Sequence, residues 1–468
     1  MLPSKFFVHR VAEETGTFSV LSDFDTLRSK LTRVNESGKM IHQLGLKEDH
    51  QLALIYHDPS LTSVETNLTR LEQGLQSVVW DKTKMVQLVG QYGTVTYNDA
   101  GMEMLSELDW SRLSFFNCYE GTLLTLFFHN DRWYLTTRRC LDAAQATWIK
   151  NKSYQQMFYE AIANRFAIDD LNKDLCYQFI LIHHLNKNIV TYSDLGRVYK
   201  QVVHLRTIEK YTNRVVKYTI NDQLLTPQQL EFETVDQLQT ELARLSEADA
   251  KAHHVSTEGV VVEVYKTPAK QQLVGLIKLQ TELYQKLNSM KPNNSNIHQS
   301  YLELYQNDRL NDFLVYFNGN KGDIIKRINT AMRHMATEIL NLYHGTRKKK
   351  NPEVYTRLPD SYRKTLYGLH GRYISHKKEV GEHSVKSGSI TVHDVYFYLK
   401  EMPADKLRQL FYERWEMITN GTAEPKFFNS NDIPIKIQTL LMFRYLIEKR
   451  QQQKQNKQGQ KLAVKKME

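Results

Sequence analysis

The chain has 468 residues, of which 41% are hydrophobic and 24% charged, a balance that indicates folded domains rather than disorder. Its formal net charge of +10 favours a polyanionic partner, with nucleic acid first, although a basic protein without such a partner is the alternative. No apolar run reaches the roughly 18 residues that a membrane span needs, and no signal-peptide pattern opens the chain, so we expect no membrane partner and a cytoplasmic location.

Expected strands and helices alternate over the first 290 residues. Helical periodicity opens at 23–27 and recurs at 63–75, 100–108, 154–166, 235–245 and 281–287. β-rich runs lie at 77–80, 85–92, 122–128, 132–137, 175–184, 189–192, 198–206, 215–220, 259–265 and 273–279. Because most runs come in pairs joined by short turns, the pattern predicts an α+β domain of mostly antiparallel sheets flanked by helices.

The hairpin expected over Thr122–Thr137 is flanked by residues suited to an anionic ligand. Glu120-Gly121 forms a sharp step before its first strand, and the basic pair Arg138-Arg139 ends its second strand. A hairpin brings these two ends together, so the acid-glycine corner and the cations predict a site for a nucleotide phosphate. The alternative is an ordinary surface hairpin.

The composition changes at Met290–Asn296, a polar stretch with proline and repeated asparagine that predicts a domain boundary. Helical periodicity follows at 297–306, 310–316, 321–343, 359–376, 391–400, 403–417 and 434–449. We expect an α+β domain over 1–290, an all-α domain over 291–450, and an unfolded basic Gln/Lys-rich tail over 451–468. Gly345 is expected to end the helix that begins at residue 321.

Two basic stretches of the helical half are candidate RNA-binding sites. The first is a run of four adjacent cations that can contact successive phosphates: Arg347, Lys348, Lys349 and Lys350. The second interleaves tyrosines, which can stack on bases, with the cations Arg363, Lys364 and Arg372. The alternatives are a solvated basic loop for the first and, for the second, an amphipathic helix whose tyrosines pack on neighbouring helices, which we favour.

Metal chemistry has little support in the sequence. The three cysteines, Cys118, Cys140 and Cys176, form no Cys-x-x-Cys pair, which argues against a disulfide framework or a thiolate zinc site. The pairs His183-His184 and His253-His254 are expected on strands, where neighbours point to opposite faces and share no ion. No GxxxxGK[ST] pattern occurs, so P-loop chemistry is not expected.

Taken in order, several segments of residues 70–290 resemble the motifs of the covalent nucleotidyltransferase superfamily, and within it the RNA ligases of the bacteriophage tRNA-repair type, relatives of which occur in large DNA viruses. The similar segments are LQSVVWDKTKMVQLVGQY at 75–92, CYEGTLLTLF at 118–127 (motif I, KxDG), TTRR at 136–139, YQFILIHHLNKNIVTY at 177–192, TEGVVVEVY at 257–265 (motif IV, EGxV) and IKLQTELYQKL at 277–287 (motif V, KxKT). The resemblance implies the ligase-type nucleotidyltransferase fold.

In that family a motif I lysine attacks the α-phosphate of ATP, carboxylates hold Mg²⁺, and a motif V lysine stabilises the phosphate. The departures here are substantial: the motif I lysine falls on Cys118, the early Arg-Gly on Gln76-Ser77, the glutamate of the Phe-Glu element on Ile180, and the second motif V lysine on Gln280. The positions that match are Glu120, Gly121, Arg138, Arg139, Glu258, Gly259 and Lys278. We expect Cys118 to pack as a small apolar group.

A chain that lacks the covalent lysine cannot make the family's first intermediate. We therefore expect a catalytically degenerate RNA-ligase-like protein that acts as an RNA-binding or scaffolding subunit of a viral nucleic-acid-processing, transcription or virion assembly, which adds the viral factory and the virion to the expected locations. The alternative is an active ATP-dependent RNA ligase, which would use ATP and Mg²⁺ and attach AMP to a different lysine. A capping guanylyltransferase needs the same motif I lysine and is disfavoured for the same reason.

Overall fold

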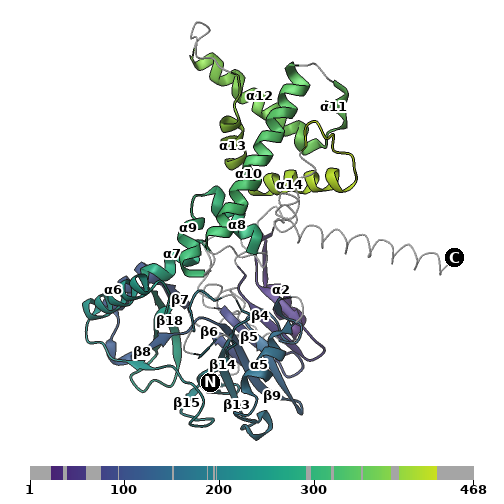
Figure 1. Ribbon diagram of the computed structural model, residues 1–468. Coiled ribbons are helices and arrows are strands. Elements are labelled where there is room, and N and C mark those ends of the chain that lie inside the picture. The colour runs from purple at the N-terminus through teal and green to yellow at the C-terminus, as the bar shows by residue number, and fades with distance from the viewer. Residues whose placement is uncertain are drawn as a thin grey trace, which may run out of the picture. The chain divides into compact units, whose positions relative to one another are not determined.

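The computed structural model of the chain describes residues 23–34, 40–58, 75–92, 94–149, 152–186, 188–192, 195–196, 198–290, 297–317, 321–348, 352–380 and 389–428. The chain divides into two compact units, residues 1–288 and 289–468 (Figure 1). The first unit is mixed helix and sheet, and its sheets are mostly antiparallel.

One five-stranded sheet of the first unit carries most of the motif residues. Its strand order is β16-β8-β17-β18-β7. The strands are β7 (Thr94–Tyr97), β8 (Leu113–Cys118), β16 (Gln229–Leu230), β17 (Gly259–Tyr265) and β18 (Leu273–Gln280). All neighbouring strands are antiparallel except β18 and β7, which run parallel.

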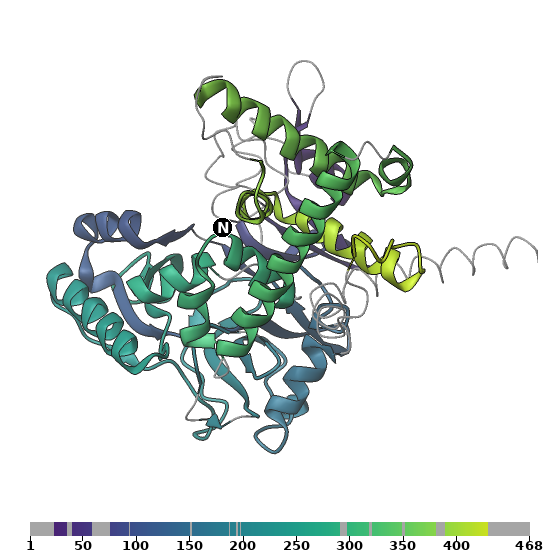
Figure 2. The same cartoon turned by 45° about the horizontal axis from the view of Figure 1, so that its top comes forward.

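Two helices cover one face of this sheet: α4 (Asn98–Glu107) and α6 (Val235–Ala252), which lie next to each other in Figure 2. Their side chains share an apolar core with alternate strand residues, namely Leu113, Phe115, Val260, Val262, Val264, Ile277 and Leu279. Because side chains alternate along a strand, the residues between them lie on the opposite face. That opposite face therefore carries Cys118, Lys278 and Gln280.

A second five-stranded sheet, in the order β10-β9-β13-β14-β15, contains the hairpin expected from the sequence. Its strands are β9 (Thr122–His129), β10 (Arg132–Thr137), β13 (Leu175–His183), β14 (Lys200–Glu209) and β15 (Val215–Val216). Helix α5 (Tyr154–Ile162) packs on one face through Met157, Phe158 and Ala161. A buried ion pair links the two sheets, with Arg206 Nη2 of β14 at 2.6 Å from Glu263 Oε1 of β17.

A four-stranded sheet packs against the second sheet through an apolar core that contains Leu54, Leu88, Phe127 and Ile208. Its strands are β3 (Gly45–Glu48), β4 (Leu52–Tyr56), β5 (Leu75–Asp81) and β6 (Val86–Tyr92). Smaller elements are α2 (Phe24–Lys30), the strand pair β1 (Thr32–Val34) and β2 (Met40–Gln43), and the pair β11 (Thr147–Ile149) and β12 (Lys152–Ser153).

Every element described between residues 297 and 428 is helical. The helices are α8 (Ile297–Gln306), α9 (Leu310–Phe317), α10 (Lys321–Tyr343), a π-helical turn (His344–Lys348), α11 (Pro352–Arg357), α12 (Asp360–Val380), α13 (Val392–Lys400) and α14 (Ala404–Thr419), while α7 (Glu282–Met290) spans the division between the units. The guanidinium of Arg414 donates from Nε and Nη2, at 2.6 Å each, to the two oxygens of Glu338, and both side chains are buried. This pair ties α14 to α10.

Most of the expected elements are confirmed to within a few residues, including the hairpin and the strand pair β17–β18. Two are wrong. Ile189–Tyr192 is not a strand, because the N–H groups of Ile189 and Val190 bond to the Glu120 side chain, and that of Thr191 bonds to the carbonyl oxygen of Val255, which belongs to no strand. Gly345 does not end α10, because the chain continues as the π-helical turn, and the glycine lets the Phe427 ring approach to 2.4 Å from where a Cβ would lie.

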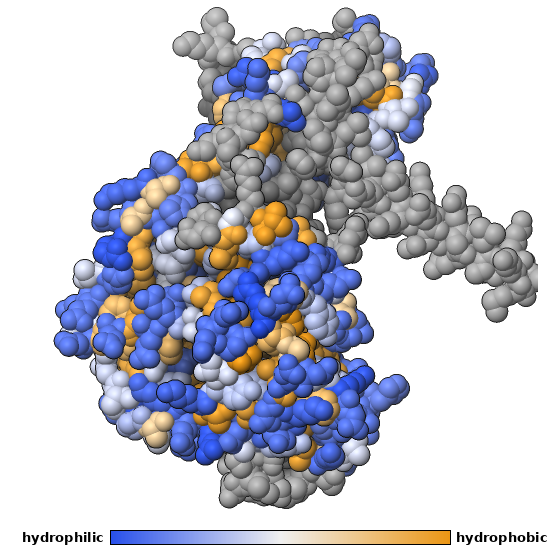
Figure 3. Space-filling model, turned by 60° about the horizontal axis from the view of Figure 1, so that its bottom comes forward, coloured by the Kyte–Doolittle hydropathy of each residue, from blue (hydrophilic) through white to orange (hydrophobic). Residues whose placement is uncertain are grey.

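Some expectations stay untested. The helices expected at 63–75 and 434–449 lie wholly or mostly outside the described residues, as does most of the linker at Met290–Asn296. The all-α domain expected up to residue 450 also includes undescribed residues, so it stays a prediction, as do the two boundaries between the three expected domains. In the described part of the chain, no helix has the length and apolar character needed to cross a membrane. On the face drawn in Figure 3, hydrophobic side chains are interspersed with hydrophilic ones.

Candidate functional site

Strand register brings the motif I, IV and V positions together at one end of the first sheet. Cys118 is the last residue of β8 and pairs with Gly259, which in turn pairs with Gln280 of β18. Residues on one rung of a sheet project to the same side, and Lys278 lies two positions from Gln280 on that side. The sequence order of the motifs is therefore matched by their convergence in space.

Glu258 joins this group because of the backbone at Gly259. Gly259 has a φ of 142°, and a Cβ there would lie 2.1 Å from the Leu279 carbonyl oxygen, so glycine is required. Outside the regular strand, the Glu258 carboxylate turns toward the face that carries Lys278 and Gln280. The glycine that follows Glu258 in the motif IV segment is therefore required for steric reasons.

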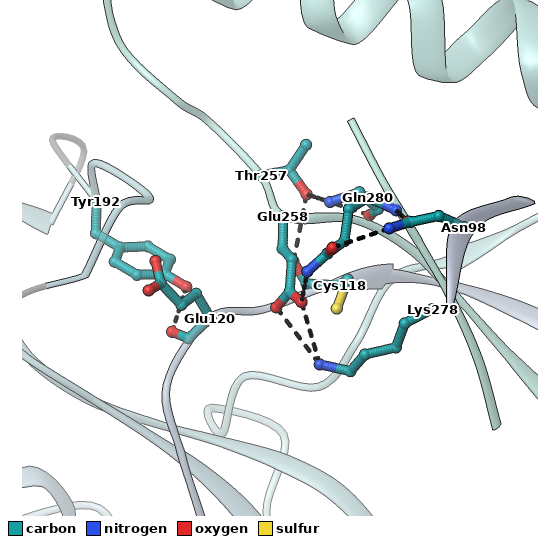
Figure 4. A network of polar contacts seen from close by, with 9 residues as sticks. Asn98, Cys118, Glu120, Tyr192, Thr257, Glu258, Lys278 and Gln280 are labelled. Carbon is teal, nitrogen blue, oxygen red and sulfur yellow. Dashed lines mark hydrogen bonds and ion pairs between the residues drawn. The ribbon is translucent and has the colours of Figure 1, made fainter. Parts of the chain in front are cut away.

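A continuous polar network connects the converging side chains (Figure 4). The Lys278 ammonium lies 3.3 Å from Glu258 Oε1, and Gln280 donates from Nε2 to the same oxygen at 3.0 Å. Asn98 completes the network: its Nδ2 donates to Gln280 Oε1 at 3.3 Å, while its Oδ1 accepts from the Gln280 backbone N–H at 3.0 Å. Gln280, where the family has a second lysine, is thus a neutral crosslink.

The protonation states of this group oppose covalent chemistry. Burial raises the pKa of the Cys118 thiol to about 12. Lys278 acts to lower this pKa, whereas Glu258 raises it further. Burial acts to lower the pKa of Lys278, but Cys118 and Glu258 outweigh it and hold that pKa above its ordinary value. At neutral pH this group of side chains therefore contains a neutral thiol and a protonated amine. Cys118 is buried as expected, but it lies in a polar group rather than an apolar one.

Glu120 forms a separate clamp on the neighbouring chain segment. Its Oε2 accepts the backbone N–H groups of Ile189 at 2.6 Å and Val190 at 2.8 Å, and its carbonyl oxygen accepts the Tyr192 hydroxyl at 2.7 Å. These bonds hold residues 189–192 against the corner before β9. Beside it, Gly121 leaves room for β13, because a Cβ would lie 2.4 Å from Ile180 Cγ2, at the position of the missing glutamate.

Two tyrosines lie within electrostatic range of both carboxylates, Glu120 and Glu258. Burial raises the pKa of Tyr284, and both Glu258 and Glu120 raise it further, so this phenol lies within electrostatic range of both acids. The same holds for Tyr192, whose pKa rises through burial and Glu120 and, to a smaller extent, Cys118 and Glu258. Sequence analysis assigned neither tyrosine to the site, although Tyr192 and Tyr284 both lie in segments that it compared with the family.

Arg138 and Arg139 directly follow the last residue of β10. Burial and the neighbouring Arg139 lower the pKa of Arg138, while Tyr97 and Asp58 oppose them. The Nε of Arg138 is buried and has no hydrogen-bond partner in the described part of the chain, which is an arrangement that a bound anion would complete. Arg139 is more exposed and lies 3.9 Å from Asp58.

The group fits a phosphate better than a divalent cation. Lys278 and the unpaired Nε of Arg138 offer positive charge, as the resemblance requires for ATP. By contrast, the carboxylate of Glu258 already bonds to Lys278 and Gln280, and that of Glu120 to two backbone N–H groups. No cluster of three or more metal-ligating side chains is found among the described residues.

The expectation about the histidine pairs is wrong in its geometry. Strand β13 ends at His183, so His183 and His184 do not alternate but stack, with ring centroids 4.5 Å apart. His253 is the left-handed cap of α6, and His254 follows it, so neither lies on a strand. These histidines therefore have structural roles: His183 and His184 stack on each other, and His253 caps α6.

The candidate RNA-binding cations of the helical half are mostly engaged. On α12, Lys364 lies 2.6 Å and Arg363 3.7 Å from Asp360 carboxylate oxygens, and Arg372 lies 2.6 Å from Glu401. Among the interleaved tyrosines, Tyr362 is fully buried while Tyr367 is 71% exposed. Of the basic run, Arg347 and Lys348 belong to the π-helical turn, whereas Lys349 and Lys350 lie outside the described residues. RNA binding at these positions stays a prediction.

Comparison with known proteins gives ligases as structural neighbours. No family model matches the chain, and no curated protein matches it in sequence. Structures of an archaeal ATP-dependent RNA ligase, forms 2 and 1, are similar at 12% and 11% identity with TM-scores of 0.35, over 61% and 62% of this chain and 71% and 76% of theirs. A protein of Aquifex aeolicus assigned as an ATP-dependent DNA ligase is similar at 10% identity and a TM-score of 0.35, over 85% of this chain and 79% of that one. These TM-scores are too low to assign a fold, so the argument below rests on the side chains.

Proposed function

We propose that this chain is a ligase-like protein that binds nucleotide phosphates or RNA ends without capturing AMP covalently. The observation that carries the proposal is the Cys118–Glu258–Lys278 group. It occupies the positions of motifs I, IV and V, and its one described amine is a protonated cation bonded to a carboxylate. A protonated amine has no lone pair with which to attack phosphorus, whereas it binds a phosphate well.

In this proposal each side chain has a binding role. Lys278 and Arg138 neutralise phosphate oxygens from two different sheets, and the bonded set Glu258, Gln280 and Asn98 holds the Lys278 side chain in position. ATP would supply the phosphate if bound, and Mg²⁺ would add charge to it. The motifs resemble those of phage and viral ligases, which favours an RNA-binding or scaffolding subunit of a viral nucleic-acid-processing, transcription or virion assembly.

The first test is covalent labelling. The purified protein is incubated with α-labelled ATP or GTP and Mg²⁺ and then denatured. We expect no label on the protein; label that survives denaturation would establish an active nucleotidyltransferase instead. The same labelling assay is applied to Cys118→Lys, which places an amine at the motif I position. Cys140→Lys is the control, because it changes a partly exposed cysteine outside the group.

The second test is equilibrium binding of ATP and of a 5′-phosphorylated RNA across salt concentrations. Lys278→Ala should weaken binding of both ligands, and it should reduce the salt dependence by about one phosphate contact. Lys278→Arg keeps the positive charge and should therefore lose less affinity for both ligands. Unchanged affinity in Lys278→Ala would contradict the proposal, because the cleft would then have no part in binding.

A further inference from the structure

Strand β10 is an edge strand of the second sheet, with β9 as its only neighbour among the described strands. His129 and Arg132 pair across a two-residue turn, so the backbone groups of Arg132 bond to β9. Backbone groups alternate in direction along an antiparallel strand, so those of Trp133 and Leu135 point away from β9. The outer edge of β10 is therefore formed by every second residue.

The chain that follows β10 covers only part of this outer edge. The Leu135 carbonyl oxygen accepts from the Ala143 N–H at 2.8 Å, and the Thr137 N–H donates to the Cys140 carbonyl oxygen at 2.9 Å. Three successive outward groups have no partner in the described part of the chain, namely the N–H and C=O of Trp133 and the N–H of Leu135.

This open part of the edge lines a groove of about 680 Å³. The turn between β3 and β4 also lines the groove, and two contacts tie that turn to the β9–β10 hairpin. Asn130 Nδ2 donates to Gln51 Oε1 at 2.6 Å, and Arg132 Nη2 lies 3.4 Å from Asp49 Oδ2. None of the lining residues is a position that matches the ligase motifs. The groove is therefore separate from the site described above.

The charges of the groove favour an acidic occupant. The acids that line it are already bonded within the chain: Asp49 and Asp142 accept backbone N–H groups. Glu48 lies 2.8 Å from a guanidinium nitrogen of Arg28. Lys47 is exposed and, within the described residues, has no ion-pair partner. A carboxylate on the occupant would supply one.

Unpaired backbone groups at a sheet edge are complementary to another extended backbone, which presents N–H and C=O groups at the same spacing. We propose that the groove binds an extended acidic segment of a partner protein, which adds a strand to β10 and places a carboxylate beside Lys47. The added strand bonds to Trp133 and to the Leu135 N–H. It ends there, because Ala143 occupies the Leu135 carbonyl oxygen.

The test adds capped pentapeptides to the full chain and follows amide hydrogen exchange. With saturating acetyl-EVEVE-amide, exchange of the Trp133 and Leu135 amides should slow, while that of Tyr134, which already bonds to β9, should not change. Acetyl-KVKVK-amide should bind more weakly. A single N-methyl group moved along the acidic peptide should weaken binding by roughly 2- to 12-fold at alternate positions only, because only every second peptide N–H faces β10.

A charge variant tests the side-chain contact separately. Lys47→Ala should weaken binding of the acidic peptide by up to about fivefold. Lys251→Ala is the matched control, because Lys251 is also exposed and lies on α6, outside the groove. Unchanged exchange at both outward amides, or N-methyl losses without alternation, would overturn the proposal. Slower exchange at these amides with a short oligoribonucleotide but not with the peptide would also overturn it, and would assign the groove to nucleic acid.

Discussion

The clamp formed by Glu120 makes a quantitative prediction about local stability. Both N–H groups that it accepts, from Ile189 and Val190, go to the same oxygen, and both residues are buried. Hydrogen bonds to a charged group contribute about 1.5–3 kcal/mol and neutral ones about 0.5–1.5 kcal/mol. Glu120→Gln keeps an acceptor oxygen but removes the charge, so the two bonds together should lose about 2 kcal/mol.

Hydrogen exchange of the Ile189 and Val190 amides measures this loss directly. A change of about 2 kcal/mol in local opening corresponds to roughly 30-fold faster exchange. Glu120→Ala removes the acceptor and leaves two buried N–H groups unpaired, so exchange there should be faster still. Glu209→Gln is the control, because that carboxylate bonds to the side chains of Arg214 and Thr212. Exchange as slow in both Glu120 variants as in wild type would refute the clamp.

Three further substitutions test other parts of the structure. Gly259→Ala should unfold the corner that presents Glu258, because its Cβ would meet the Leu279 carbonyl oxygen; loss of ATP binding with a lowered Tm is expected, and an unaffected Tm would contradict it. In the helical unit, Arg414→Met should destabilise the protein by about 3–5 kcal/mol in chemical denaturation because it removes the buried ion-pair partner of Glu338, while a second change, Glu338→Leu, should recover most of that loss. Burial lowers the pKa of His204 to about 4, below the roughly 6.5 of an unfolded histidine, so the unfolded chain binds a proton that the fold does not and stability should fall between pH 6.5 and 4. His204→Gln should flatten that part of the stability profile, and an unchanged slope would assign it to other groups.

The sequence predicted two strands of the first sheet, β17 and β18, but not β7, β8 or β16. The apolar positions of β17 and β18 mark the face covered by α4 and α6, which leaves Lys278 and Gln280 on the other face. The resemblance to motifs I, IV and V then identified the residues that meet there. The pairing of β8 with β17 brings Cys118 to these residues, because its register places Cys118 opposite Gly259.

The missed features depend on contacts between distant segments. Asn98 contacts Gln280 across 182 positions of sequence, and no local pattern relates the two. Residues 189–192 have strand-like side chains, but Glu120 supplies the acceptors that a neighbouring strand would otherwise provide. Tyr97 lies between the elements predicted at 85–92 and 100–108, and only its pairing with Lys278 places it beside this group.

In the proposed function, the cysteine at position 118 and the protonation state of Lys278 are connected through their charges. With a neutral thiol at position 118, the positive charge of Lys278 is balanced by Glu258, and its proton is held firmly. A lysine at position 118 would add a second cation within reach of the first, and like charges lower the pKa of both amines. A lowered pKa is what makes an amine nucleophilic at neutral pH. In the proposed function, the cysteine at position 118 supplies no attacking amine, and the same electrostatics keep Lys278 protonated for binding a phosphate.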